Sequence, residues 1–319
     1  MTVKTTAIQR RIFVTGMLMG AADLVPGISG GTVALLSGIY GRLLAAIGCF
    51  SHVDLLKLLW RFQVVKAWRY MDGLFLMNLS LGIVIALVGL SKLITWLLLV
   101  QPLLMWSLFS GLIIMASILL LQELKAKRQL HRSWLVVGLG VSLVLANMPV
   151  LQLVDGFSGW GYLWLMAAGA LAITAMILPG ISGSFILLML DIYPFLLASL
   201  AALDMQVIAV FACGCGLGLL AFSRVIGYLL KQHTAAVMSL LAGLMTGSVV
   251  KLWPWKHTLT YRLNSAGSEV PLQQENLMPW VYSQMTGIDN QLIWCLLVAC
   301  LAAFLVAKFG RIQLQDLAV

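Results

Sequence analysis

Residues Gly16 to Tyr40 read GMLMGAADLVPGISGGTVALLSGIY. A second stretch, from Gly169 to Tyr193, reads GALAITAMILPGISGSFILLMLDIY. A constant offset of 153 residues, from position 16 to position 169, superposes the two and aligns the five residues Pro-Gly-Ile-Ser-Gly in each. A shared run of this composition is improbable by chance, so it predicts a chain built from two related halves.

The composition indicates that the bilayer is the solvent for most of this chain. Of its 319 residues, 61% are hydrophobic and only 10% are charged, whereas a soluble domain carries about 25% charged residues. A helix needs about 20 apolar residues to cross the hydrocarbon core. Six segments approach that length, and we expect them to span the membrane in an all-α integral membrane protein: 73–91, 103–122, 134–152, 206–229, 235–252 and 291–307.

The lysines and arginines favour one topology. If segments 12–50 and 160–203 each form a re-entrant helical hairpin, the loops on one side hold fourteen bases and those on the other hold four: Lys92, Lys251, Lys256 and Arg262. The positive-inside rule then places the base-rich side and both termini in the cytoplasm. The same rule accounts for the net charge of +9, so we expect no nucleic-acid partner.

Counting elements then predicts an inverted repeat. The first membrane repeat covers residues 1–155 and the second covers 156–319, each with one re-entrant hairpin and three spans. Because three is an odd number, the second half enters the membrane from the opposite side. We expect residues 51–72 to form an interfacial helix and residues 253–290 to form an outside loop. Inverted repeats with broken helices are a recurring plan of secondary transporters, whose site lies near the midplane.

The repeated motif also predicts a binding site. Proline ends a helix, and the glycines allow unusual backbone angles. We expect Ser29 and Ser182 to cap the half-helices that follow. The free amides at the start of these half-helices suit a phosphate or carboxylate. The candidate anion-binding residues are Gly27, Ser29, Gly30, Gly31, Thr32, Gly180, Ser182, Gly183 and Ser184. The alternative is that the motif only shapes helix packing.

A few ionisable residues fall within the membrane segments. Asp23 lies three residues before Pro26, and its counterpart in the second half is Met176. Asp23 is either a single proton-coupling group or a group that hydrogen-bonds the broken turn. Arg42 and Arg224 either extend to lipid headgroups or bind phosphate. The four histidines and five cysteines form no metal-binding or catalytic pattern, and we expect no cofactor.

Three segments carry a resemblance to a known family. ADLVPGISGGTVALLSGIY, AMILPGISGSFILLMLDIY and GLMTGSVVKLWPW resemble the bacterial polyprenyl-phosphate (undecaprenyl-phosphate) transporters, formerly a membrane family of unknown function. The resemblance covers nearly the whole chain. It implies a flippase with inverted hairpins that returns undecaprenyl phosphate across the bacterial cytoplasmic membrane for cell-envelope synthesis. We expect it to work by alternating access with proton coupling through Asp23. The partners it implies are the polyprenyl-phosphate lipid and membrane lipids.

Two other functions remain as alternatives. A transporter or channel for a small soluble anion would use the same polar cavity. An intramembrane lipid pyrophosphate phosphatase would need a nucleophile, a base and clustered acids near the turns. The three glutamates, Glu123, Glu269 and Glu275, all lie outside the apolar segments, so we expect no enzyme.

Overall fold

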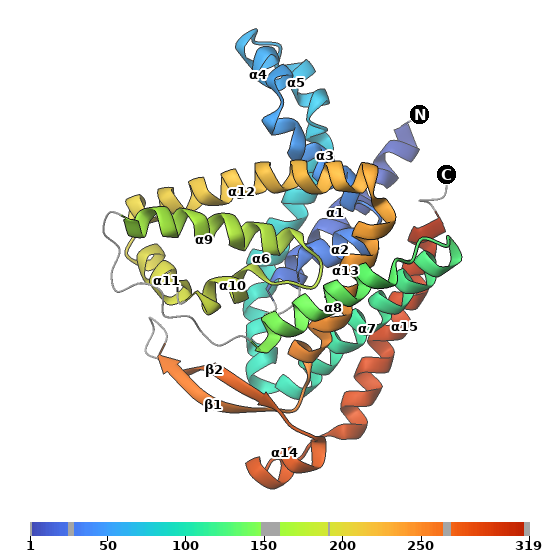
Figure 1. Ribbon diagram of the computed structural model, residues 1–319, viewed down its shortest axis with the longest axis vertical. Coiled ribbons are helices and arrows are strands. Elements are labelled where there is room, and N and C mark those ends of the chain that lie inside the picture. The colour runs from blue at the N-terminus through green and yellow to red at the C-terminus, as the bar shows by residue number, and fades with distance from the viewer. Residues whose placement is uncertain (1, 25–28, 148–159, 191, 264–268, 316–319) are drawn as a thin grey trace.

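The computed structural model describes residues 2–24, 29–147, 160–190, 192–263 and 269–315 (Figure 1). The first half comprises α1 (Thr2–Asp23), α2 (Gly30–Leu36), α3 (Tyr40–Gly48), η1 (Cys49–Ser51), α4 (Val53–Trp60), α5 (Val64–Tyr70), α6 (Gly73–Val100), α7 (Pro102–Ala126) and α8 (Arg132–Asn147). The second half comprises α9 (Trp160–Ile177), α10 (Gly183–Met189), α11 (Tyr193–Ala201), α12 (Met205–Gln232), α13 (Thr234–Ser248), η2 (Val249–Leu252), β1 (Lys256–Leu263), β2 (Glu269–Asn276), α14 (Pro279–Thr286) and α15 (Leu292–Gln315).

The predicted spans correspond to helices. Four of the described helices are long and apolar enough to cross a membrane, namely α6, α7, α12 and α13 continued through η2. The other two predicted spans coincide with shorter apolar helices, α8 and the Leu292–Lys308 part of α15. Residues 148–152 of the third predicted span lie outside the described residues. The structure therefore confirms a mostly helical, multi-pass membrane protein, whereas the inversion of the halves stays a prediction.

Each half opens with a long helix and two short helices. Another long helix follows, directly as α12 in the second half and after η1, α4 and α5 as α6 in the first. The first helix of each half ends at Asp23 or Ile177, shortly before the motif proline. Pro26 lies outside the described residues, whereas Pro179 is fully buried. Proline ends these helices because it lacks an N–H and disfavours the helical conformation in the residue before it. The short helices α2 and α3 are bent relative to each other by 118°.

Helix pairing joins the halves into one body. In both halves the first helix packs along the long helix after the connector, α1 on α6 and α9 on α12. The remaining helices pair across the halves, α7 with α15 and α8 with α13. Glycines lie at these crossings, where a side chain on Gly111 would collide with the backbone of α15 and one on Gly243 with that of α8. Small residues allow such close approach between membrane helices.

Two sequence-based expectations need correction. The loop 253–290 contains an antiparallel pair, β1 and β2, followed by α14, so the fold is not purely helical. From Thr258 to Leu263 the segment KHTLTYRL alternates polar and apolar residues, which is the period of a strand. The connector 51–72 forms two short helices, α4 and α5, where one was expected. Phe62 separates them in a left-handed conformation with φ 53°, which a helix cannot continue through.

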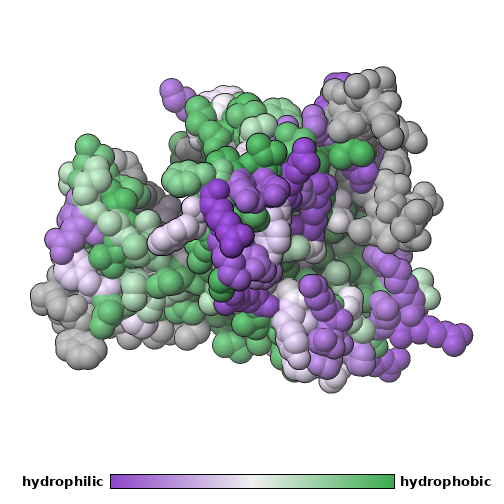
Figure 2. Space-filling model, turned by 90° about the horizontal axis from the view of Figure 1, so that it is seen from above, coloured by the Kyte–Doolittle hydropathy of each residue, from purple (hydrophilic) through white to green (hydrophobic). Residues whose placement is uncertain are grey.

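The connecting segments gather at two ends of the molecule. Figure 1 shows α4, α5, the start of α1 and the end of α15 in its upper half, whereas β1, β2 and α14 lie at the bottom. Figure 2 views the upper end, where hydrophilic residues gather over the middle of the face with hydrophobic residues beside them. Which side of the membrane each end faces stays a prediction.

Two glycines of α8 provide a matched test of the packing. A Cβ atom on Gly138 would collide with the carbonyl oxygen of Leu240 in α13, whereas one on Gly140 would meet nothing within 4 Å. We expect Gly138→Ala to lower the thermal unfolding midpoint in detergent, because overpacking costs about 1–3 kcal/mol. Gly140→Ala should leave the midpoint unchanged or raise it, since alanine favours helix. Equal midpoints for the two variants would contradict this packing.

Candidate anion-binding site at the paired turns

The two motif turns touch each other, although they are far apart in the sequence. The Ser29 hydroxyl of the first turn donates a hydrogen bond of 3.1 Å to the carbonyl oxygen of Leu178 in the second. The backbone amide of Gly180 donates one of 3.1 Å to the Thr32 hydroxyl. Leu178 follows the last residue of α9, where backbone groups lack helical partners. The first turn thus satisfies polar backbone groups of the second.

Close backbone approach explains two of the motif glycines. A side chain on Gly31 would collide with the carbonyl oxygen of Ile177 at the end of α9. Gly180 has φ +85° and lies against α13, where a Cβ atom would be 2.9 Å from the Leu244 carbonyl oxygen. Only glycine fits both the backbone angle and the space at that position. The second turn is therefore held between α2 on one side and α13 on the other.

Asp23 closes the first turn. Its carboxylate oxygen Oδ1 accepts a hydrogen bond of 2.6 Å from the backbone amide of Gly30, the first residue of α2. This contact is the turn-bonding role, one of the two roles predicted for Asp23. The Gly30 amide, which we expected to bind an anionic ligand, is therefore already bonded to the Asp23 carboxylate. A ligand at this amide must displace the carboxylate or meet it in its protonated form.

Ser29 and Ser182 occupy the N-cap positions of α2 and α10, but their side chains do not cap these helices. Both residues are extended, with φ −126° and ψ 144° at Ser29 and φ −102° and ψ 127° at Ser182. Neither hydroxyl bonds to an amide of the helix that follows, so the predicted capping bonds are wrong. The hydroxyl of Ser29 has an acceptor across the interface at Leu178 instead. The hydroxyl of Ser182 lies 2.9 Å from that of Ser184.

The second turn is buried up to Gly183 and reaches the surface at Ser184. Ser184 is exposed, and Met176, the counterpart of Asp23, is 37% exposed. Within the described ranges, the amides of Gly183 and Ser184 at the start of α10 have no hydrogen-bond acceptor. Two amides beside a hydroxyl pair suit the oxygen atoms of a phosphate. Ser182, Gly183 and Ser184 are therefore the predicted site residues best placed to receive an anion.

The two arginines predicted as phosphate-binding residues, Arg42 and Arg224, lie on different helices, α3 and α12. The Arg42 guanidinium binds both carboxylate oxygens of Asp72, at 2.6 and 3.1 Å, and lies 4.3 Å from the centroid of the Phe75 ring. Arg42 belongs to α3, and residues 33–39 lie between Thr32 of the first turn and the start of that helix. Arg224 is exposed on α12, which packs against α3. Gly27, another predicted site residue, lies outside the described residues.

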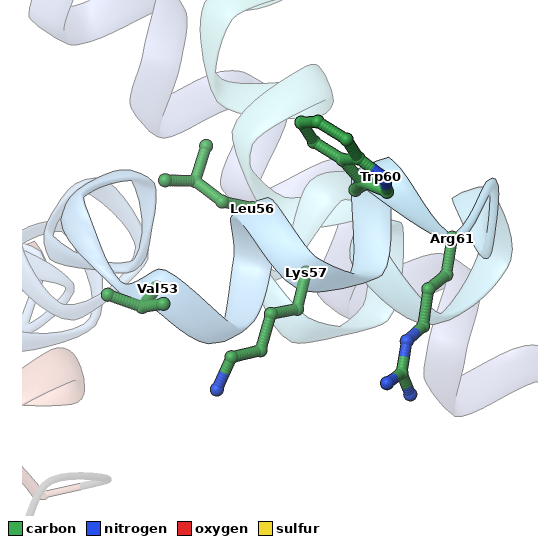
Figure 3. Close-up of a pocket in the computed structure, with 5 residues that line it drawn as sticks. All are labelled: Val53, Leu56, Lys57, Trp60 and Arg61. Carbon is green, nitrogen blue, oxygen red and sulfur yellow. The ribbon is translucent and has the colours of Figure 1, made fainter.

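A further feature of the base-rich end is the apolar surface of α4. Figure 3 shows Leu56 and Trp60 on one side of this helix and Lys57 and Arg61 on the other, around a shallow pocket. Trp60 is 88% exposed, and Phe62 just after the helix is 89% exposed. Large exposed apolar side chains flanked by bases are typical of a helix that lies in a membrane interface.

Comparisons with known proteins place the chain in a family. The VCA0040-like family, described as undecaprenyl phosphate translocase-like, matches residues 19–270, a range that includes both turns. The chain belongs to this family. It is 39% identical over 295 residues to a polyprenyl-phosphate transporter of Vibrio cholerae serotype O1 (strain ATCC 39315 / El Tor Inaba N16961), covering 92% of this chain and 94% of the relative.

A second relative is more distant. A polyprenyl-phosphate transporter of Staphylococcus aureus (strain NCTC 8325 / PS 47) is 30% identical over 258 residues, which cover 75% of this chain and 84% of the relative. No solved structure matches the chain. The family resemblance found in the sequence is thereby confirmed, and both relatives are named as transporters.

Thr32 offers a direct test of the contact between the turns. We expect Thr32→Val to lower the free energy of unfolding by about 1 kcal/mol, because it removes the acceptor for the Gly180 amide at almost constant volume. Thr32→Ser keeps the hydroxyl and serves as the matched control. The measurement is thermal unfolding of the purified protein in detergent. If Thr32→Val is as stable as the unchanged protein, the hydrogen bond does not hold the turns together.

Proposed function

We propose that this protein transports undecaprenyl phosphate across the bacterial cytoplasmic membrane and returns the lipid carrier for cell-envelope synthesis. One observation carries the proposal: two polar turns from different halves meet inside an apolar helical protein. The names of the relatives support a polyprenyl phosphate as the substrate. The inverted repeat with two re-entrant hairpins belongs to the same proposal.

The chemistry of the substrate fits such a site. A polyprenyl phosphate has a small charged head and a long apolar tail, so only the head needs shelter from hydrocarbon. Leaving a phosphate unsolvated in hydrocarbon is costly, because each lost polar contact costs several kcal/mol. The amides of Gly183 and Ser184 and the hydroxyls of Ser182 and Ser184 would replace part of its hydration. The tail stays in lipid.

Protonation of Asp23 would couple binding of the lipid phosphate to uptake of a proton. In its charged form the carboxylate holds the Gly30 amide and repels a phosphate from the first turn. Protonation removes the charge, weakens this hydrogen bond and leaves the amide to an incoming phosphate oxygen. Loss of the proton on the other side would restore the carboxylate and expel the head. Proton and lipid phosphate then move in the same direction.

The contacts between the turns suit an alternating-access cycle. The hydrogen bonds of Ser29 and Thr32 cross from one half of the chain to the other. A movement of one half against the other would exchange these bonds for contacts with the phosphate. Secondary transporters with inverted repeats work by such movements around a fixed central site.

The α4–α5 segment adds a membrane contact on the cytoplasmic side. We infer that Trp60 and Phe62 lie among lipid headgroups, while the neighbouring bases Lys57 and Arg61 face lipid phosphates. A nitroxide attached at Trp60→Cys is expected to report headgroup depth in nanodiscs by electron paramagnetic resonance. Full accessibility to a water-soluble relaxation agent would contradict this placement.

A transport assay in proteoliposomes tests the proposed function and separates it from transport of a small anion. Labelled undecaprenyl phosphate should cross faster than in protein-free liposomes, and a proton gradient should drive its accumulation. Labelled inorganic phosphate should not accumulate. Accumulation of inorganic phosphate without movement of the lipid would support the small-anion transporter instead.

Asp23 is the residue to substitute in that assay. We expect Asp23→Asn to abolish the response of lipid flux to the proton gradient, because the amide cannot exchange a proton, while the protein still folds. Asp54→Asn, which changes an exposed carboxylate of α4, is the matched control and should keep the response. Gradient-driven flux that survives in Asp23→Asn would show that Asp23 only bonds the turn.

A further inference from the structure

An apolar recess opens where the half-helix of the first turn meets two long helices. It has a volume of about 220 Å³ and lies between α2, α7 and α13. Its apolar wall consists of Leu35, Leu36, Leu119, Leu120 and Met238. Leu35, Leu119 and Leu120 are only 7%, 5% and 7% exposed. The recess therefore enters the packed interior and differs from the outer surface of the helices.

The size of the recess suits a short piece of hydrocarbon. Protein interiors pack with few voids larger than a water molecule. An engineered apolar cavity of about 150 Å³ binds benzene, which is slightly larger than one isoprene unit. The recess exceeds that volume and has a wall of leucine and methionine side chains. It therefore has room for at least one isoprene unit.

Charged residues lie at the mouth of the recess. Glu123 and Lys127 of α7 complete its lining, and their side chains form an ion pair of 2.6 Å. The Lys127 side chain is 47% exposed, and the nearby bases Lys125 and Arg128 are exposed as well. An ammonium group has three N–H donors, so Lys127 can contact a phosphate while Glu123 stays bound. The mouth thus offers an excess of positive charge beside an apolar wall.

The recess lies close to both motif turns. Leu35 comes five residues after Gly30, the start of α2, which is about 8 Å along the helix. On α13, Met238 comes seven residues before Met245, which contacts Gly180 of the second turn. That separation is about 10 Å along the helix. The recess is therefore within about two helical turns of both motif turns.

We propose that this recess binds the first isoprene unit of the polyprenyl phosphate, with the phosphate held at its mouth by Lys127, as the lipid travels between the paired turns and the base-rich end. The inference rests on the proposed function for the identity of the lipid. The phosphate is bonded directly to the first isoprene unit, so a phosphate at Lys127 places that unit at the apolar wall. A phospholipid fits less well, because glycerol separates its phosphate from its apolar chains.

The test uses farnesyl phosphate whose first isoprene unit carries a diazirine, a group that inserts into neighbouring C–H bonds when illuminated. The probe is illuminated with the full chain in nanodiscs, and the modified residues are mapped by peptide mass spectrometry. We expect about tenfold more insertion into Leu119 and Leu120 than into Val88 and Val136, which are exposed on α6 and α8. An excess of undecaprenyl phosphate should abolish this preference.

Matched variants test the wall and the mouth separately. Leu36→Trp should lower insertion at Leu119 and Leu120 by about tenfold, because the indole fills the recess, whereas Leu36→Ala should keep it. Lys127→Gln should raise the probe concentration for half-maximal insertion by about tenfold, whereas Lys127→Arg should leave it unchanged. The mapping on the unchanged chain decides the matter even where a variant folds poorly.

The remaining outcomes overturn the site or separate it from the proposed function. Insertion only at lipid-facing residues would overturn it, and so would equal competition by phosphatidylglycerol, which would make the recess a phospholipid site. Insertion in the recess of a protein that moves no lipid in proteoliposomes would support the site and refute the proposed function. Lipid transport without insertion in the recess would support the function and refute the site.

Discussion

Polar backbone groups inside an apolar protein must find hydrogen-bond partners, and this requirement determines how the two halves meet. Each motif turn breaks a helix and exposes amides and carbonyl groups where no water compensates them. Hydroxyls of the first turn meet the Leu178 carbonyl and the Gly180 amide of the second turn, and Asp23 meets the Gly30 amide. The duplicated motif thus requires the two halves to fold against each other.

The asymmetry between the halves follows from the same constraint. The first turn has its own carboxylate, whereas Met176 stands at the matching position of the second. The amides at the start of α10 then depend on a group from elsewhere, and a phosphate is the group that the proposed substrate supplies. A duplicated scaffold with one charged and one uncharged turn can bind a single headgroup and respond to a single proton.

Much of this arrangement could be predicted from the sequence. The offset between the motifs, the six apolar segments and the helix ends before the prolines follow from local pattern and composition. Tertiary contacts could not be predicted in that way. The bond between Ser29 and Leu178 replaced the expected cap because the competing acceptor lies far away in sequence. The ion pair of Arg42 with Asp72 and the strands β1 and β2 likewise depend on neighbours that no local window contains.

If the paired turns bind the phosphate of a polyprenyl lipid, that phosphate lies against them in the loaded protein. The most direct measurement is an experimental structure of the full chain in nanodiscs with undecaprenyl phosphate, at a resolution that shows the phosphate. We expect phosphate density within hydrogen-bond distance of the Gly183 and Ser184 amides, with the turns still facing each other. Density for the headgroup only at sites remote from both turns, with the amides of α10 bonded to protein, would contradict it.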